Sequence, residues 1–258
     1  MRTPIVFLVG AAILVSPLAG QSLSQRIARA PDGIVRMSFA AREGVCGNGR
    51  NINTYRSNSR SERNKDGWDS DCEPGPVRVA VDVRGGAVQH VRTYVGGRWR
   101  SYDGGGAADL GTVGAREVGE YFLALAGTGT KVNGDPLTPA VLADSIVVWP
   151  GLLRIGKNQD VPMSVRRQAI FWLSQEVSEE ATRGLAEIAE SETDEQEVRK
   201  QAVFALSQLR DGAGVPVMIR VARGDKDPAI RKQAIFWLGQ SGDSRAIEFF
   251  EEVLTRKP

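Results

Sequence analysis

Val165-Arg-Arg-Gln-Ala-Ile-Phe-Trp-Leu-Ser-Gln175 is a stretch that the chain repeats twice more, almost unchanged. The later copies are Val198-Arg-Lys-Gln-Ala-Val-Phe-Ala-Leu-Ser-Gln208 and Ile230-Arg-Lys-Gln-Ala-Ile-Phe-Trp-Leu-Gly-Gln240, and the three copies begin 33 and 32 residues apart. Self-similarity at a fixed spacing of about 20 to 50 residues is typical of proteins built from stacked structural repeats. We therefore expect the repeat to decide the architecture of the second half of the chain.

Each copy has the apolar spacing of a helix. In the first copy Val165, Ala169, Trp172 and Leu173 stand at positions i, i+4, i+7 and i+8, which lie on one helical face. Ile170 and Phe171 extend the apolar surface around both sides of that face. A helix that is apolar almost all round must be covered on several sides, and stacked helix pairs supply that cover.

A second helix is predicted after each copy, at a similar spacing. The three predicted second helices cover residues 179–190, 214–223 and 244–255, and a further one begins near Pro150. Asp227 followed by Pro228 predicts the start of the third copy's helix, because Asp is a good N-cap and proline suits the first helical turn. Asp194 is expected to cap the middle copy in the same way.

This pattern resembles the HEAT-like repeat family, in the short form also seen in phycobilin-lyase-type proteins. The matching features are the opening Val-Arg or Ile-Arg pair, the first Ala and the turn after the third copy, at Val165, Arg166, Val198, Arg199, Ile230, Arg231, Ala169, Ala202, Ala234 and Gly239-Gln-Ser-Gly-Asp243. Trp172 and Trp237 replace the family's small Ala, which Ala205 keeps. The resemblance covers residues 150–257 and implies a helical scaffold, but no residue matches a lyase motif and a fold alone carries no activity.

The predicted fold class is α+β, with a C-terminal α-solenoid of about three and a half HEAT-like helix pairs over residues 138–258. A small β-rich domain is expected over residues 34–110, followed by a helix and linker over 111–137. Residues 23–33 are expected to form a mobile or weakly helical leader. Segments around the cysteines, Val45-Cys-Gly-Asn-Gly49 and Asp71-Cys-Glu-Pro-Gly-Pro76, resemble an uncharacterised domain that accompanies such repeats in exported bacterial proteins.

Strands are predicted where apolar and polar residues alternate, at residues 34–40, 77–84 and 87–95. Gly85 and Gly86 join the last two segments, and two glycines between such segments are a strong hairpin signal because the favoured turns need positive φ angles. Residues 47–70 contain almost no apolar side chain, and we therefore expect a long loop there.

The N-terminal residues 1–22 have the pattern of an export signal. Arg2 precedes an uncharged apolar run over residues 5–15, and small residues follow at a possible cleavage site. The run is shorter than the ~20 residues of a spanning helix, although an uncleaved membrane anchor is the alternative. We expect an exported protein, periplasmic or secreted, with no membrane span after signal cleavage. Cys46 and Cys72 are then expected to form a disulfide rather than two buried free thiols.

Composition bounds the function. With 33 basic and 31 acidic residues the net charge is +2, which argues against a nucleic-acid binder. We find no catalytic constellation and expect no cofactor. The predicted function is that of a non-enzymatic interaction or scaffold protein of the cell envelope, binding a protein or peptide through the concave face formed by the second helices. The candidate residues of that face are Arg154, Arg183, Glu187, Arg220, Arg223, Arg245 and Glu248. A solvated face without a partner is the alternative.

Several residue types occupy one position in all three copies. Arg166, Arg199 and Arg231 are expected to hold the turns of adjacent repeats, together with Gln168, Gln201 and Gln233, although a row of guanidinium groups could also bind an anionic partner. Phe171, Phe204 and Phe236 are expected in the core between repeats. An exposed aromatic row that grips a peptide is the alternative.

Two alternative functions concern the N-terminal half. His90 is the single histidine, and strand alternation places Val88, Arg92 and Tyr94 on its face, so an enzyme or enzyme-assembly factor with a site there is one alternative. A lone His with no free Cys cannot build the common zinc site or a Cys-His pair. A calcium-stabilised surface module is the other alternative. Asp66, Asp69 and Asp71 have the oxygen ligands of a calcium loop without its twelve-residue spacing, so a plain acidic turn is expected.

Overall fold

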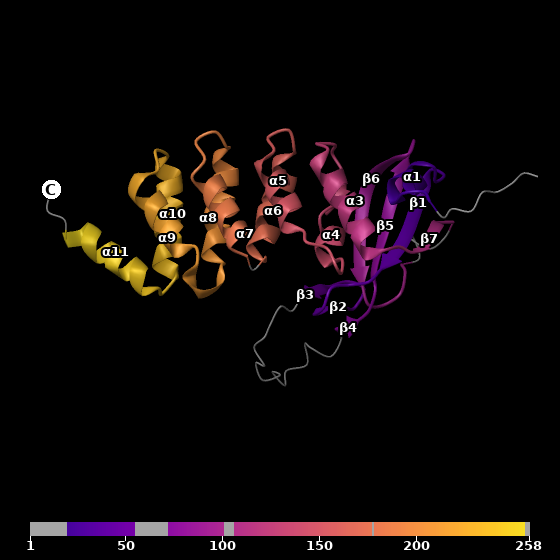
Figure 1. The fold of residues 1–258 in the computed structure, drawn as a ribbon, viewed down its shortest axis with the longest axis horizontal. Helices are drawn as coiled ribbons and strands as arrows, with labels where there is room; N and C mark the ends of the chain where they lie inside the picture. Colours follow the sequence, from indigo (N-terminus) through magenta and orange to yellow (C-terminus); the bar gives the residue numbers. More distant parts are fainter. Residues whose placement is uncertain (1–19, 55–71, 101–105, 177, 256–258) are drawn as a thin grey trace, which may run out of the picture.

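The computed structural model of the protein describes residues 20–54, 72–100, 106–176 and 178–255. In Figure 1 the chain forms a row that begins with strands and continues with helices as far as α11. The predicted α+β class, with an N-terminal β-rich region and a C-terminal helical region, is confirmed.

The main sheet has five strands in the order β7-β1-β5-β6-β8. Their bounds are β1 Gly33–Phe39, β5 Val77–Arg84, β6 Ala87–Val95, β7 Ala108–Thr112 and β8 Asn133–Gly134. β5 and β6 form an antiparallel hairpin, and the φ angles of Gly85 and Gly86, 56° and 75°, confirm the predicted turn. β7 and β8 pair in parallel with β1 and β6, and β8 lies inside the predicted linker.

An irregularity in β6 changes which residues share a face of the sheet. Asp82 of β5 lies opposite His90, but the next residue, Val83, lies opposite Val88, so Gln89 has no counterpart on β5. A bulge of this kind interrupts the alternation of side chains between faces. Val88 is therefore buried on the core side, only 4% exposed, and the prediction that it shares the face of His90 is wrong.

A smaller sheet lies at the edge of the β-rich region. It has the order β3-β2-β4, with β2 Val45–Gly47, β3 Ile52–Thr54 and β4 Glu73–Pro74. The predicted disulfide between Cys46 and Cys72 is present and ties β2 to the start of β4. The first part of the predicted long loop is therefore strand, and its residues 55–71 lie outside the described chain.

The segment predicted as a mobile or weakly helical leader begins with a docked helix, α1 Leu23–Ala28. Ser22 and Gln25 form a reciprocal capping box at its start, which satisfies backbone N–H groups that would otherwise lack partners. Leu23 and Ile27 are each 1% exposed. The backbone N–H of Leu23 donates to Glu117 of helix α3, Ala115–Gly127 (2.5 Å), and that carboxylate also pairs with Arg26 (3.2 Å). Burial and these bonds fix the segment in place.

The helical region alternates first helices, which carry the three copies, with second helices. The helices are α3 Ala115–Gly127, α4 Thr138–Leu142, α5 Trp149–Lys157, α6 Met163–Ser174, α7 Glu179–Ala189, α8 Gln196–Ser207, α9 Val215–Gly224, α10 Pro228–Gln240 and α11 Ser244–Thr255. The first helices α6, α8 and α10 pack one against the next, and the second helices are α5, α7, α9 and α11. Among the described residues, no helix combines the length and apolar character needed to cross a bilayer.

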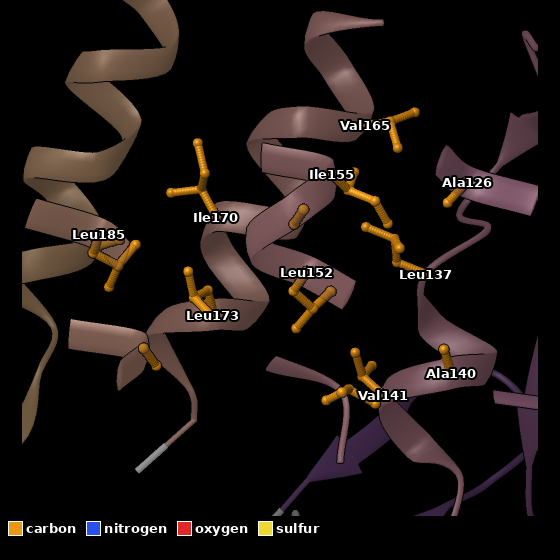
Figure 2. Close-up of a cluster of buried hydrophobic side chains, with 14 of the residues drawn as sticks. Ala126, Leu137, Ala140, Val141, Leu152, Ile155, Val165, Ile170, Leu173 and Leu185 are labelled. Atoms are coloured by element: carbon orange, nitrogen blue, oxygen red, sulfur yellow. The ribbon is translucent and has the colours of Figure 1, made fainter. Parts of the chain in front are cut away.

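One apolar core runs through both regions. It includes Leu23 of α1 and Phe249 of α11. Each α-helix between them contributes a buried side chain, and so do strands β1, β2, β5 and β6. Figure 2 shows its middle part, where Ala126 of α3 and Leu137 approach Ile155 of α5. The β-rich region, α3 and α4 therefore cover the first end of the helical row.

Candidate interaction surfaces on the helical repeats

The arginine near the start of each copy is an internal tie. Arg166 of α6 is fully buried, its Nε donates to the carbonyl oxygen of Gly156 in α5 (3.0 Å), and its guanidinium pairs with Asp194 and Glu195 just before α8. A hydrogen bond from its own backbone and one from Arg166 hold the pKa of Glu195 below its usual range. One side chain thus connects three successive parts of the row.

The second arginine acts in the same way, and the third makes only part of these contacts. Arg199 donates to the carbonyl oxygen of Ala189 through Nε (3.1 Å) and a terminal nitrogen (3.0 Å), and it pairs with Asp225. Arg231 donates to the backbone oxygens of Asp225 (2.6 Å) and Lys226 (3.1 Å). Arg166 and Arg199 hold the turns of adjacent repeats, which is the structural role that the sequence predicts, whereas Arg231 holds the turn before its own helix.

Asp194 does not cap the middle copy. The N-cap of α8 is Glu195, and no side-chain hydrogen bond caps that helix. Asp194 is turned instead toward Arg166, because a fully buried guanidinium requires a carboxylate partner. Asp227, by contrast, caps α10 as predicted, with its side chain accepting from the backbone of Ala229 (2.8 Å).

The phenylalanine row lies at the surface. Phe171 is 41% exposed and Phe236 is 55% exposed, while Phe204 is partly buried. The prediction that this row forms the core between repeats is therefore wrong for Phe171 and Phe236. The preceding residues, Ile170 and Val203 in the first two copies, are fully buried and take the inward positions. One further residue along an α-helix turns the side chain by about 100°, toward solvent.

Trp237 links this row across two helices. The ring of Trp237 in α10 lies 5.1 Å from that of Phe204 in α8 and 5.0 Å from that of Phe236, measured between centroids. In α6, Phe171 and Trp172 make a similar edge contact at 5.2 Å. The indole N–H of Trp237 is buried and has no hydrogen-bond partner among the described residues.

A glutamine stands three residues before each phenylalanine. Gln168, Gln201 and Gln233 are half-buried, and their side chains make no hydrogen bond within the part of the chain that the structure describes. The prediction that they serve beside the arginines is wrong, because they lie on the opposite, aromatic side. A hollow of about 370 Å³ between α6 and α8 is lined by Asp135, Ser164, Arg167, Gln168, Phe171, Trp172 and Gln201.

We call this surface the aromatic face: Gln168, Phe171, Trp172, Gln201, Phe204, Gln233, Phe236 and Trp237. A basic residue precedes each of its glutamines. Arg167 and Lys232 are exposed and make no ion pair with a described residue, whereas Lys200 pairs with Glu197 at 3.0 Å. The face thus combines aromatic rings, amide groups and positive charge.

The seven charged residues predicted for the partner-binding face are all exposed. All of them lie on the second helices, with Arg245 at the start of α11. Ion pairs join each second helix to the next: Lys157 to Glu187 (2.7 Å), Arg220 to Glu190 (2.9 Å), and Arg223 to Glu252. Three of the seven predicted residues, Glu187, Arg220 and Arg223, are therefore engaged within the protein.

The remaining four residues are held differently. Arg245 hydrogen-bonds Asp243 and lowers the pKa of that carboxyl to about 2, and it also donates to the backbone oxygen of Gly212, before α9. Arg154 lines a hollow of about 560 Å³ between α3 and α5. Arg183 and Glu248 make no ion pair with a described residue. Of the seven residues, three are therefore engaged in ion pairs between second helices, and Arg245 is held at a turn.

Within the described residues, His90 makes no hydrogen bond to a carboxylate of the kind that orients a catalytic histidine. Its one hydrogen-bond partner among the described residues is Arg92, whose terminal nitrogen lies 3.3 Å from Nδ1. A guanidinium has no acceptor and cannot replace the carboxylate that orients a catalytic imidazole. The calcium candidates Asp66, Asp69 and Asp71 lie outside the described residues.

Comparison with known proteins agrees with the repeat architecture. No curated protein matches the chain. Residues 182–258, from within α7 to the end of the given sequence, match the protein family described as HEAT repeats.

Proposed function

We propose that this protein is a non-enzymatic interaction or scaffold protein that binds a protein or peptide along the aromatic face. The match to HEAT repeats supports an interaction role, because stacked repeats form extended binding surfaces. The observation that carries the proposal is the exposure of Phe171 and Phe236 at equivalent positions of a repeat whose other apolar residues are mostly buried. Large apolar patches on a protein surface mark interaction sites.

The arrangement of the aromatic face fits an extended segment of chain. Neighbouring helices lie about 8 to 10 Å apart, and an extended strand advances about 3.3 Å per residue, so each repeat spans roughly three residues of a bound peptide. An extended peptide exposes backbone N–H and C=O groups that must be paired. The side-chain amides of Gln168, Gln201 and Gln233, which make no hydrogen bond to a described residue, recur at the interval of the repeats and can both donate and accept.

Charge further defines the partner. Arg167 and Lys232 are exposed at the two ends of the aromatic face without an ion pair in the described chain. Complementary charge on a partner speeds association and selects among partners. We therefore propose a segment that carries acidic residues and at least one large apolar side chain.

The charged second helices are the competing surface. They were predicted as the concave binding side, and Arg154, Arg183 and Glu248 are available there. Exposed ion pairs contribute little binding energy, whereas aromatic residues dominate the energetics of interfaces. The aromatic face is therefore the stronger proposal.

The proposed location is the cell envelope or the exterior. The disulfide between Cys46 and Cys72 supports it, because such bonds persist in oxidising compartments. The signal-like pattern of residues 1–22 supports it from the sequence alone.

A peptide-display selection on the purified chain tests the proposal. Bound peptides should be enriched in acidic and large apolar residues, and binding should fall at least tenfold in the double variant Phe171→Ala, Phe236→Ala. Both side chains are substantially exposed, so the variant should fold normally.

The matched control is the double variant Arg183→Ala, Glu248→Ala on the second helices. It should leave peptide binding unchanged. Loss of binding in this control, together with full binding in the phenylalanine variant, would move the site to the second helices. A selection that enriches no peptide would argue against an extended partner.

A further inference from the structure

The last helix pair exposes apolar residues whose counterparts in earlier repeats are buried. On the first helices, Ile170 and Val203 are fully buried, but the equivalent Ile235 of α10 is 44% exposed. Val203 and Ile235 are 32 residues apart, the same interval that separates the second and third copies. The difference therefore arises from the position at the end of the row and not from the residue type.

The second helices show the same change. Val215 and Ala222 of α9 are 2% and 8% exposed, whereas Ile247 and Leu254, 32 residues later on α11, are 54% and 84% exposed. Phe250, which corresponds to the buried Met218 of α9, is partly buried and lies on the same side of α11. We call Ile235, Ile247, Phe250 and Leu254 the terminal face.

The contacts inside the chain indicate what fits this face. In earlier repeats, the next helix pair packs against the equivalent positions and covers them. The terminal face therefore has the shape and apolar character that receive another helix pair of the repeat type. The other end of the row is covered by α3, α4 and the β-rich region (Figure 1). Within the described chain, the terminal face is therefore the end of the helical row that no other element covers.

We propose that two copies of this protein associate through their terminal faces, related by a two-fold axis. Ile247 and Leu254 are placed almost symmetrically about Phe250 and Glu251 on α11. Two antiparallel α11 helices that cross at Phe250 and Glu251 would place Ile247 of one copy against Leu254 of the other. Such an interface is closed, because each copy uses the same patch, and it yields dimers rather than filaments.

The size of the face sets the strength of the dimer. α10 has 13 residues and α11 has 12. At 1.5 Å per residue and a helix spacing of 8 to 10 Å, the pair presents roughly 400 Å² per copy. Specific interfaces usually bury about 1,200 Å² or more in total, so the dimer is weak and depends on protein concentration.

Sedimentation velocity on the purified chain tests the dimer. The average mass should rise from monomer toward dimer with concentration, and Leu254→Glu or Ile247→Glu should each keep the chain monomeric at every concentration. Val147→Glu is the matched control, because Val147 is 70% exposed but lies before α5, far along the row, and it should dimerise as the unmodified protein does. A chain that is monomeric throughout, or a dimer that survives both glutamate variants, would overturn the proposal.

Cysteine cross-linking tests the two-fold axis. No free cysteine exists among the described residues, so a cysteine introduced at Glu251 is a clean probe. Glu251→Cys should form a covalent dimer under mild oxidation, and the additional change Leu254→Glu should prevent it. The control Glu179→Cys, exposed on α7, should stay monomeric. Equal cross-linking at both positions would show that contact between copies is not specific to this face.

Discussion

Replacing Arg166 with alanine should be among the most damaging single changes in the helical region. The guanidinium is 0% exposed and pairs with Asp194, whose side chain is only 8% exposed, and with Glu195, which is 45% exposed. After truncation Glu195 can turn to water, but Asp194 keeps a buried charge without a counterion. Removing one partner of a buried ion pair costs about 3 to 5 kcal/mol.

The third copy supplies a matched control for this prediction. Arg231 occupies the equivalent position but is partly exposed, and it donates only to backbone oxygens, of Asp225 and Lys226. Each such hydrogen bond contributes about 1 kcal/mol, so Arg231→Ala should cost roughly 1 to 2 kcal/mol. The loss of unfolding free energy should therefore be about twofold or more larger for Arg166→Ala than for Arg231→Ala.

Urea unfolding followed by far-ultraviolet circular dichroism measures both losses. The double variant Arg166→Ala, Asp194→Ala should be less damaged than the sum of its single variants, because it removes the stranded carboxylate as well. If Arg166→Ala and Arg231→Ala cost the same within ~0.5 kcal/mol, the argument from the buried charge is refuted.

Three further predictions follow from local structure. Reducing the disulfide, whose cysteines are 26 residues apart, should cost about 3 kcal/mol, and a melting temperature unaffected by reductant would contradict this. Gly96 has φ 65°, and a Cβ there would lie 2.1 Å from a backbone oxygen of β2. Gly96→Ala should therefore lower the free energy of unfolding by more than ~1 kcal/mol, measured by thermal unfolding. The control Gly239→Ala, where α10 leaves open space for the methyl group, should be neutral or stabilising. The carboxyl of Asp243 should titrate near pH 2 by NMR instead of 3.8. The stabilisation from its pair with Arg245 is therefore present above about pH 4 and is lost as the pH falls toward 2. Arg245→Ala should return the pKa of Asp243 toward 3.8.

The sequence predicted the helical repeats well because their signals are local. The apolar spacing, the proline after Asp227 and the fixed interval between copies all act within a few turns of helix, and the two glycines of the hairpin act within one turn. The fold class followed from these signals, and the disulfide followed from the presence of two cysteines and an export pattern.

The errors arose where a neighbour distant in sequence decides the outcome. A helix that is apolar on almost every side does not reveal which side lacks a neighbour, so Phe171 was assigned to the core with Ile170. Gln89 is displaced by a bulge that depends on pairing with β5, which alternation alone cannot show. β8 has two residues and exists because β6 offers an edge. Part of the aromatic face could have been found by noting that Gln168 recurs beside Phe171 on the side away from Arg166.

The ion pairs between second helices give the two sides of the row different mechanical properties. Lys157–Glu187, Arg220–Glu190 and Arg223–Glu252 are exposed, so dissolved salt weakens them as the Debye length falls from about 10 Å at 0.1 M to about 3 Å at 1 M. The first helices are held by buried side chains that salt does not screen. Raising the ionic strength should therefore weaken the contacts between the second helices and leave those between the first helices unchanged. The curvature of the row of helices should change as a result.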